Sequence, residues 1–344
     1  MKVMPRDNYI MLVGHNYDEH KLDFSLYAKE RARQAINRTK KGKDIHVQIM
    51  DVSAGTTSSI SVAWQSGTST TKIGTPKTHE PVTAKSYDRN GAFNPNQPRI
   101  MSITDLYAAV RKIGETEPGT LVEVSILSHA YLEGPILVNS DDNLPDDPIM
   151  GTLSIRDPND KDGRSGKDFD VMQANELALF RNAFSPQGLV WIWGCNSKPA
   201  MHQLLSTVRR KQPNNFAGGM IELTGLTSEL IDIIVRLNGY LNVDVTELRR
   251  KYRCKFDATK LRSAVAAMVK GSYQYKVSSV AKVRAVGALP ATYAVKRSKT
   301  DPLQLLHIEP VTRKHSAYYS SNFGIKFDDE NRGYAIFEPG FVID

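Results

Sequence analysis

Two side chains that do covalent chemistry in enzymes follow two similar apolar runs. His129 comes after LVEVSILS, residues 121–128, and Cys195 comes after GLVWIWG, residues 188–194. Each run has the length and the apolar content of a strand that is buried in a parallel sheet. A cysteine thiolate attacks carbonyl carbon, and an imidazole transfers the protons that this attack and the leaving group require. The pattern therefore predicts nucleophilic catalysis by Cys195, with His129 as the base.

The position of both residues at strand ends predicts that they lie close together. In an open parallel sheet, ligands bind outside the carboxyl ends of the strands, and neighbouring strands lie about 4.8 Å apart. We expect the backbone N–H groups of Cys195 and Ala130 to form an oxyanion hole. We expect Gly194 to give the turn before the nucleophile an unusual backbone conformation, which glycine adopts at low cost.

Four further residues are candidates for the lining of the same pocket. His15 follows the first predicted strand in VGHNY, and Asp51 lies near the end of the second in IHVQIMDV. Trp193 and Asn196 flank the Gly-Cys step of the predicted nucleophile. Because these positions share the carboxyl edge of the predicted sheet, we expect them to lie around a bound substrate.

The elements that position these residues are predicted from the spacing of apolar side chains. Residues 9–13 and 45–52 are apolar enough for buried strands, and residues 22–37 between them repeat apolar side chains at helical spacing. A strand–helix–strand unit of this length is typical of a parallel sheet. Further helices are predicted at 102–113 and 175–184. The predicted fold class is α/β, with a Rossmann-like, mostly parallel sheet flanked by helices and a helix-rich C-terminal part.

Composition divides the chain into segments. Residues 53–98 are rich in Ser, Thr, Gly, Asn and Pro, which favours a loop insertion that carries a hairpin. We predict a catalytic core over residues 1–212 that contains this insertion. We predict a helix-rich extension over residues 213–344, whose short strands pack on the core. The acidic, Pro-containing stretch 141–170 is predicted to be a solvated loop.

The order of the two motifs resembles a known group of enzymes. A strand that ends in Ser-His and a later strand that ends in Gly-Cys-Asn-Ser are similar to the caspase-like clan of cysteine peptidases, which includes caspases, separases, clostripain and gingipains. The resemblance covers about residues 9–210. It implies a caspase-like sheet and a peptidase or amidohydrolase activity with a His129/Cys195 dyad. It also implies a protein or peptide substrate and no cofactor.

The chain departs from the pattern of this clan in two places. Ala130 stands where the clan usually has glycine after the histidine, and its backbone is less free than that of glycine. Trp193 stands where members that are specific for arginine often have aspartate. This position therefore gives no support to a preference for basic substrates.

The composition excludes several other classes of protein. The chain has 344 residues, two cysteines and a formal net charge of +8. Two cysteines exclude a disulfide scaffold and a four-cysteine metal site, and no His-Glu-x-x-His motif is present, so we expect no metal. The basic clusters are short and are not interleaved with aromatic residues, which disfavours nucleic acid as a partner.

The distribution of apolar residues bears on location. No apolar run reaches the roughly 18 residues of a membrane-spanning helix, so we expect no membrane partner. The first residues lack the apolar core of a secretory signal. We therefore expect a cytoplasmic protein, or one that is exported without a cleaved signal peptide. No pattern in the sequence indicates an oligomeric state.

Two other functions fit the same residues. A non-enzymatic α/β binding module would keep the sheet and use its edge to hold a partner. Another thiol acyl-transfer enzyme, such as a deamidase-type effector, would use the same cysteine on a different acyl group. Cysteines at strand ends are also commonly inert packing residues, and Cys254, in KYRCKF, is interpreted in that way.

Overall fold

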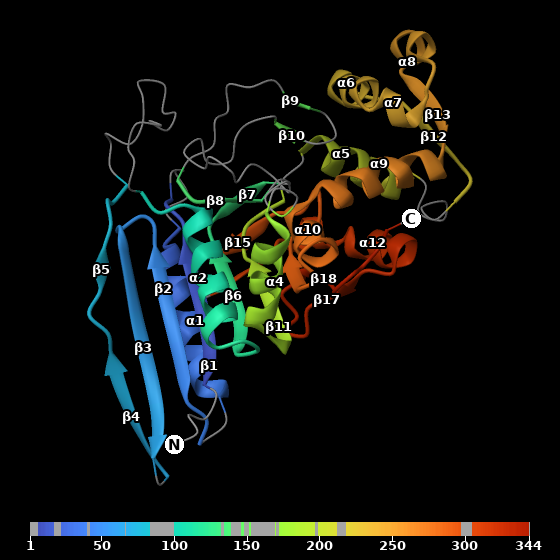
Figure 1. Cartoon of the computed structure of the whole chain (residues 1–344). Coiled ribbons are helices and arrows are strands. Elements are labelled where there is room, and N and C mark those ends of the chain that lie inside the picture. Colours follow the sequence, from blue (N-terminus) through green and yellow to red (C-terminus); the bar gives the residue numbers. More distant parts are fainter. Residues whose placement is uncertain are drawn as a thin grey trace.

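The centre of the molecule is a ten-stranded, mixed sheet (Figure 1). The computed structural model describes residues 6–16, 22–39, 42–65, 67–82, 100–131, 134–138, 146–147, 151–152, 169, 172–196, 199–211, 218–296 and 305–343. Nine strands follow one another in the order β17-β18-β14-β11-β6-β1-β2-β3-β4, and β5 pairs with β3 beside β4.

The middle of this sheet is parallel. Its strands are β2 (Ile45–Asp51), β1 (Asp7–Val13), β6 (Leu121–Leu127), β11 (Phe184–Ile192) and β14 (Arg284–Gly287). These strands are apolar on both faces because helices cover the sheet on both sides. The predicted unit over residues 9–52 is observed as β1, α1 (Phe24–Arg38) and β2. The predicted fold class, a mostly parallel sheet flanked by helices with several helices in the C-terminal part, is confirmed.

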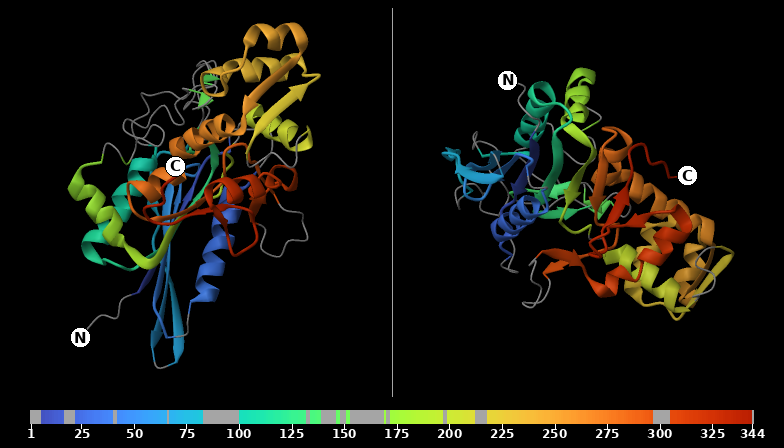
Figure 2. Two further views of the ribbon diagram at one scale, coloured as in Figure 1. Left: turned by 90° about the vertical axis from the view of Figure 1, so that its right-hand side faces the viewer. Right: turned by 90° about the horizontal axis from the view of Figure 1, so that it is seen from below.

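Alternation along the strands divides the core into two clusters. In β1, Ile10 and Leu12 belong to one apolar cluster, whereas Met11 and Val13 belong to the other. The second cluster is covered by α1, and its Tyr27 is 1% exposed. The first cluster is covered by the remaining sheet-flanking helices, which lie on the opposite face (Figure 2): α2 (Ile103–Thr116), α4 (Ala174–Ala183) and α10 (Tyr273–Ser279).

Side chains that cap the first turn mark the start of two of these helices. Asp23 caps α1, and its carboxylate accepts a hydrogen bond from the Leu26 N–H at 2.9 Å. Ser102 and Asp105 form a capping box at the start of α2, in which each side chain accepts from a backbone N–H of the first turn. Such caps satisfy donors that have no partner inside the helix.

The segment predicted as an insertion carries the expected hairpin. Strands β3 (Thr56–Gln65) and β4 (Thr68–Ile73) pair antiparallel, and β3 also pairs antiparallel with β2, so the hairpin continues the sheet. The short strand β5 (Lys77–Thr78) pairs with β3 as well. Residues 83–98 of the predicted insertion lie outside the described residues, as does most of the predicted solvated loop 141–170.

The C-terminal third contributes three strands to the sheet. Beyond β11 lie β14, then β18 (Ala335–Phe337) and β17 (Lys326–Phe327), which pair antiparallel. Strand β14 is apolar, as a strand that is buried on both faces must be. It pairs with the outer edge of β11, which would otherwise have no hydrogen-bond partner. The domain boundary at residue 212 stays a prediction.

A smaller unit extends from one end of the body (Figure 1, Figure 2). It contains a separate antiparallel pair, β12 (Met220–Thr224) with β13 (Arg253–Asp257). Its helices are α6 (Ser228–Arg236), α7 (Asn238–Leu241) and α8 (Val245–Lys251), and it adjoins α5 (Pro199–Lys211) and α9 (Ala258–Gly271). Across the described residues, none of the helices has the length and apolarity that crossing a membrane requires.

Short elements complete the edge of the sheet. Two hairpins lie outside the main sheet, β7 (His129–Tyr131) with β8 (Gly134–Ile136) and β15 (Ala294–Lys296) with β16 (Leu306–Ile308). A two-residue pair, β9 (Asp146–Asp147) with β10 (Gly151–Thr152), is also described. The last helices are α11 (Pro310–Arg313) and α12 (Ser316–Phe323).

Candidate active site

The strands that precede His129 and Cys195 are direct neighbours. Strands β6 and β11 pair in parallel, and Ile126 lies opposite Ile192. The Trp193 N–H donates to the Ile126 carbonyl at 2.9 Å, which continues the pairing past the end of β11. His129 lies three residues after Ile126, and Cys195 lies three residues after Ile192. The backbones of the two residues therefore leave the sheet side by side at its carboxyl edge.

Gly194 is required at this edge because the backbones approach too closely for a side chain. A Cβ at Gly194 would lie 2.5 Å from the Ala130 Cβ, 2.7 Å from the Ser128 carbonyl oxygen and 2.9 Å from the Ala130 nitrogen. Gly194 is not among the residues with positive φ, so the predicted unusual backbone conformation is wrong. Glycine instead lets the nucleophile strand lie against the histidine strand.

Both reactive side chains follow the same face of the sheet. Leu127 and Trp193 belong to the apolar cluster that α1 covers. Because side chains two positions apart along a strand share a face, His129 and Cys195 are expected on that side as well. The ring of Phe24, at the start of α1, lies edge-on to the His129 ring with a centroid distance of 5.1 Å. This contact fixes His129 on the α1 face.

The His129 ring is also held by a hydrogen bond from the first strand. Its Nε2 lies 2.7 Å from the Oδ1 of Asn16, three residues after β1. With the amide in this orientation, Nε2 carries the proton and donates, so Nδ1 of the neutral ring is the basic nitrogen. Asn16 therefore selects the tautomer and the direction of the imidazole.

The Cys195 thiol lies against the backbone of β15. Its Sγ accepts a hydrogen bond from the Ala294 N–H at 3.2 Å and lies 3.5 Å from the Ala294 carbonyl oxygen. The side chain is half-buried. Asn196, the next residue, pairs with Thr292 in an isolated bridge through its backbone N–H. The segment that leads from β14 to β15 thus runs beside the predicted nucleophile.

The other predicted pocket residues divide into two groups. His15 and Asp51 lie at the carboxyl ends of β1 and β2, and the Ser53 hydroxyl is 3.0 Å from the His15 Nδ1. Burial lowers the pKa of His15, and the charge of Asp51 opposes this shift. Asp51 also accepts a hydrogen bond from the Ala54 N–H at 2.9 Å, which closes the turn after β2.

Trp193 and Asn196 are both buried beneath the edge. Trp193 is fully enclosed and stacks on Trp191, with ring centroids 4.3 Å apart and planes 7° from parallel. The Asn196 amide donates to the Ala288 carbonyl at 3.1 Å, at the end of β14. Both side chains are therefore enclosed, at 0% and 1% exposure, on either side of the Gly194-Cys195 step.

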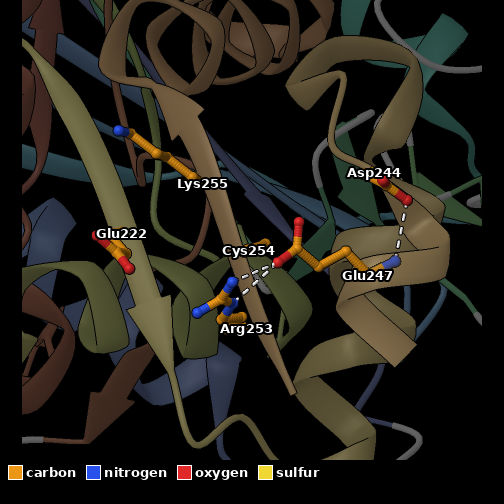
Figure 3. A pocket seen from close by; sticks show the side chains of 6 residues that line it. All are labelled: Glu222, Asp244, Glu247, Arg253, Cys254 and Lys255. Atoms are coloured by element: carbon orange, nitrogen blue, oxygen red, sulfur yellow. Dashed lines mark hydrogen bonds and ion pairs between the residues drawn. The ribbon is translucent and has the colours of Figure 1, made fainter. Parts of the chain in front are cut away.

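The second cysteine lies in the smaller unit. Cys254 is 7% exposed, and burial raises the pKa of its thiol to about 12. It borders a polar pocket (Figure 3), whose lining residues are Glu222, Asp244, Glu247, Arg253, Cys254 and Lys255. Within the ranges that the structure describes, no group of three or more His, Cys, Asp or Glu residues is placed to hold a metal ion.

Three contacts of the site have no simple sequence signal. Asn16 is preceded by His15, which drew attention to this loop, but the amide itself resembles any loop asparagine. Ala294 acts through its backbone, so its identity carries no information. Tyr334, whose hydroxyl donates to the Trp193 carbonyl at 2.8 Å, lies in a segment with no resemblance to a motif.

Solved structures similar to this chain are C11 cysteine proteases. A secreted C11 protease of Bacteroides thetaiotaomicron, iotapain, matches with 11% identity and a TM-score of 0.29, over 56% of this chain and 47% of that one. A secreted C11 protease from the same organism, in complex with an irreversible peptide inhibitor, matches with 12% identity and a TM-score of 0.27, over 72% and 57%. An inactive zymogen C11 protease from Parabacteroides distasonis matches with 10% identity and a TM-score of 0.28, over 92% and 95%.

These likenesses are distant. The matched region spans about half the length of the first two proteases, 47% and 57%. No family model matches the chain, and no curated protein matches it. C11 proteases belong to the caspase-like clan that the sequence resembles, and the structural similarity to them is low in both TM-score and identity.

Proposed function

We propose that the chain is a cysteine-dependent peptidase or amidohydrolase in which Cys195 is the nucleophile and His129 transfers protons. The observation that carries this proposal is the paired end of two neighbouring parallel strands, in one register and on one face, at these two residues. A rigid sheet edge holds reacting groups within the narrow range of positions that catalysis requires. No metal ion is needed for the steps that follow.

The proposed reaction has two stages. Nδ1 of His129 takes the proton of the Cys195 thiol as the sulfur attacks the carbonyl carbon of the scissile amide, and the electron pair of the carbonyl double bond moves to oxygen. The C–N bond then breaks, His129 donates a proton to the leaving amine, and a thioester remains. In the second stage His129 takes a proton from water as the water oxygen attacks the thioester. The C–S bond then breaks, and His129 returns this proton to the sulfur, which releases the acid and the Cys195 thiol.

Backbone donors are proposed to stabilise the oxyanion. The Ala130 nitrogen lies beside Gly194, as the distance of 2.9 Å from its hypothetical Cβ shows. We assign the N–H groups of Ala130 and Cys195 to this role, because preorganised donors stabilise charge that develops only in the transition state. Asn16 keeps the His129 proton on Nε2, so Nδ1 is the nitrogen that exchanges protons with the substrate.

The surroundings of the thiol support a peptide as the substrate. Strand β15 pairs with β16 along one edge, while the N–H and carbonyl groups of Ala294 are turned to Cys195. This backbone edge therefore faces the nucleophile. An extended peptide adds to such an edge by main-chain hydrogen bonds, which bring its carbonyl groups to a fixed distance from the neighbouring residue.

The test is a comparison of Cys195→Ala and His129→Ala with the unchanged chain on a peptide library. We expect each variant to lose hydrolysis by roughly 1,000-fold or more, and the double variant to be scarcely slower, because the two residues act as one unit. Cys254→Ala is the matched control and is expected to keep full activity. Hydrolysis that survives both Cys195→Ala and His129→Ala would refute the proposal, as would a chain that cleaves no member of the library.

A further inference from the structure

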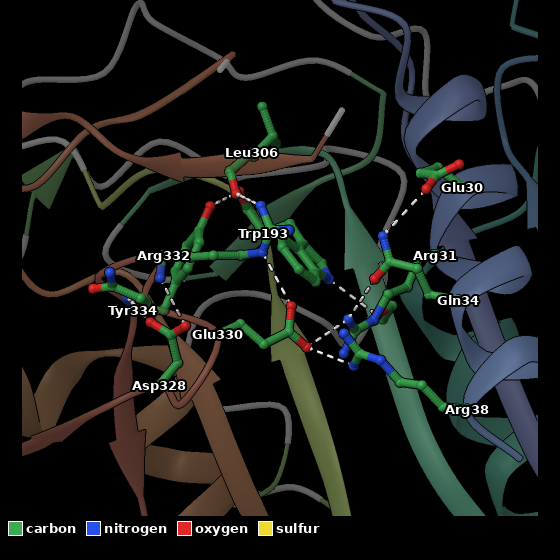
Figure 4. A network of polar contacts seen from close by, with 12 residues as sticks. Glu30, Arg31, Gln34, Arg38, Trp193, Leu306, Asp328, Glu330, Arg332 and Tyr334 are labelled. Carbon is green, nitrogen blue, oxygen red and sulfur yellow. Dashed lines mark hydrogen bonds and ion pairs between the residues drawn. The ribbon is translucent and has the colours of Figure 1, made fainter. Parts of the chain in front are cut away.

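Trp193, two residues before the proposed nucleophile, is held by hydrogen bonds to both its N–H and its carbonyl group. The Trp193 N–H donates to the Ile126 carbonyl of β6 at 2.9 Å. The Trp193 carbonyl accepts from the Tyr334 hydroxyl at 2.8 Å (Figure 4). Trp193 is therefore fixed on one side to β6, the strand that leads to His129, and on the other side to the segment that contains Tyr334. Gly194 and Cys195 follow directly from it.

Tyr334 is itself held firmly. It is fully buried, and its ring lies edge-on to Trp191 and Trp193 at centroid distances of 6.0 and 5.7 Å. Its backbone N–H donates to the Asp328 carboxylate at 2.8 Å, and the same carboxylate accepts from the Arg332 N–H at 2.9 Å. The turn 328–334 therefore presents the Tyr334 hydroxyl in one direction.

Ion pairs of Glu330, two of them with buried arginines, attach this turn to the rest of the molecule. Glu330 accepts from Arg31 and Arg38 of α1, at 2.7 and 2.8 Å, and from Arg332 at 3.0 Å (Figure 4). Arg31 also pairs with Glu123 of β6 at 2.7 Å. The turn is thus tied to helix α1, which contacts His129, and to strand β6, which precedes His129. Through Tyr334 it is also tied to the segment between β11 and Cys195.

We propose that Tyr334 is a positioning residue for Cys195, and that the turn 328–334 sets the direction in which the Gly194-Cys195 step leaves the sheet. Tyr334 contacts no substrate in this proposal and acts only through the Trp193 carbonyl. A small misplacement of a reacting group lowers the rate strongly even when the substrate still binds. The inference rests on the proposed function for its activity measurement, and a second measurement on the thiol stands apart from it.

The hydroxyl is suited to this role because it remains a donor. Burial, and after it the negative charge of Cys195, raises the pKa of Tyr334 well above its ordinary value. The hydroxyl is therefore protonated at neutral pH. Phenylalanine at this position would keep the ring contacts and remove only the hydrogen bond.

The test compares Tyr334→Phe with two control variants. Tyr27→Phe removes a buried hydroxyl, on the same face of the sheet, that has no hydrogen-bond partner in the described part of the chain. Tyr107→Phe removes a buried hydroxyl hydrogen bond, to Tyr273 at 2.9 Å, in the cluster on the opposite face. The first control matches the chemical change, and the second matches the loss of a buried hydrogen bond.

For Tyr334→Phe we expect kcat on a cleaved peptide to fall about 10- to 100-fold, with KM within about twofold, because positioning rather than binding is impaired. The alkylation rate of Cys195 by an irreversible peptide electrophile should fall in parallel. Both controls should keep the kcat and the alkylation rate of the unchanged chain. Rates are expressed per folded molecule, from the unfolding curve of each variant.

Replacement of Tyr334 by para-aminophenylalanine restores a donor at the same position and should recover most of the lost rate. An unchanged kcat and alkylation rate in Tyr334→Phe would overturn the proposal, as would an equal loss in Tyr107→Phe. If Tyr334→Phe does not fold, recovery of folding without activity in the para-amino variant would also overturn it. A chain that cleaves no peptide but shows slower Cys195 alkylation only in Tyr334→Phe would refute the proposed function and retain this inference.

Discussion

The charged residues behind Trp193 and those beside Cys254 are of the same types, but water reaches them to different extents. The side chains of Arg31, Glu123 and Glu330 are 4%, 9% and 18% exposed, and they pair with one another in the interior. The side chains of Glu247 and Arg253 are 37% and 46% exposed, and they pair at the surface. The first set holds separate segments together, whereas the second links helix α8 to the start of strand β13, which follows it in the chain.

The same comparison separates the two cysteines. Cys254 lies in a basic stretch of the chain, and cations that contact a thiol stabilise its thiolate form. Strand β13 alternates, however, so Arg253 and Lys255 are exposed while Cys254 is buried between them. Cations on the opposite face of a strand do little for a thiol, and burial raises its pKa to about 12. Local sequence charge is therefore a poor guide to the reactivity of a cysteine on a strand.

Removal of the buried cation Arg31 should have the largest effect on the free energy of unfolding. Arg31→Met leaves Glu123 and Glu330 buried with fewer cations, which typically costs about 3–5 kcal/mol of unfolding free energy. The matched change Arg253→Met at the surface should cost less than about 1 kcal/mol, because water solvates the remaining Glu247. Urea unfolding of both variants measures the difference. Equal losses would show that the two charge clusters are energetically alike.

Alkylation should sharpen the contrast between the thiols. With a pKa of about 12, only about one Cys254 in 10,000 is a thiolate at pH 8, and burial also excludes the reagent. We expect iodoacetamide to modify Cys195 at least about 100 times faster than Cys254 in the folded chain. Mass spectrometry of peptides after timed quenching gives both rates. Comparable rates would mean that Cys195 is an inert packing residue.

A smaller effect on the free energy of unfolding is expected when the pH is lowered. Burial raises the pKa of Glu330, but the charges and hydrogen bonds of Arg31, Arg38 and Arg332 outweigh this and lower it to about 2. The folded-state pKa is below the unfolded value, so the stabilisation is complete above about pH 4.5 and is lost as the pH falls towards 2. Glu330→Gln should flatten the fall in urea stability over this range.

Glu247→Gln is the surface control for this experiment. Hydrogen bonds from Arg253 and Lys251 lower the pKa of Glu247, but its carboxylate is open to water. Solvent screens such pairs, so the acid dependence of stability should stay close to that of the unchanged chain. An equal flattening in both variants would remove the distinction between the buried and the exposed cluster.

The sequence was informative where structure is set locally. Period-two and helical spacing predicted β1, α1 and β2, and the apolar runs before His129 and Cys195 predicted β6 and β11. The hairpin of β3 and β4 followed from its turn-forming composition. The neighbouring ends of β6 and β11 could be anticipated because a parallel sheet presents all carboxyl ends at one edge.

Contacts between distant segments could not be predicted in this way. Arg31 lies on a helix where a charged side chain ordinarily faces water, and its burial depends on Glu123 and Glu330, which are 92 and 299 positions away. Asn16 and Tyr334 likewise gain their roles only from what the fold brings to them. Gly194 was singled out for its backbone freedom, whereas its lack of a side chain is what the packing requires.

The place of β14 between β11 and β18 has a consequence for the order in which the chain is made. Until residues 284–287 are synthesised, β11 has no neighbour on its outer side and is an open edge. Ala294 and Tyr334 follow later still, so a nascent chain that already contains Cys195 lacks the backbone that contacts its thiol and the donor to Trp193. A ribosome that pauses after α5 therefore holds a sheet without a completed edge, and the surroundings of Cys195 are assembled only after residue 334 has been made.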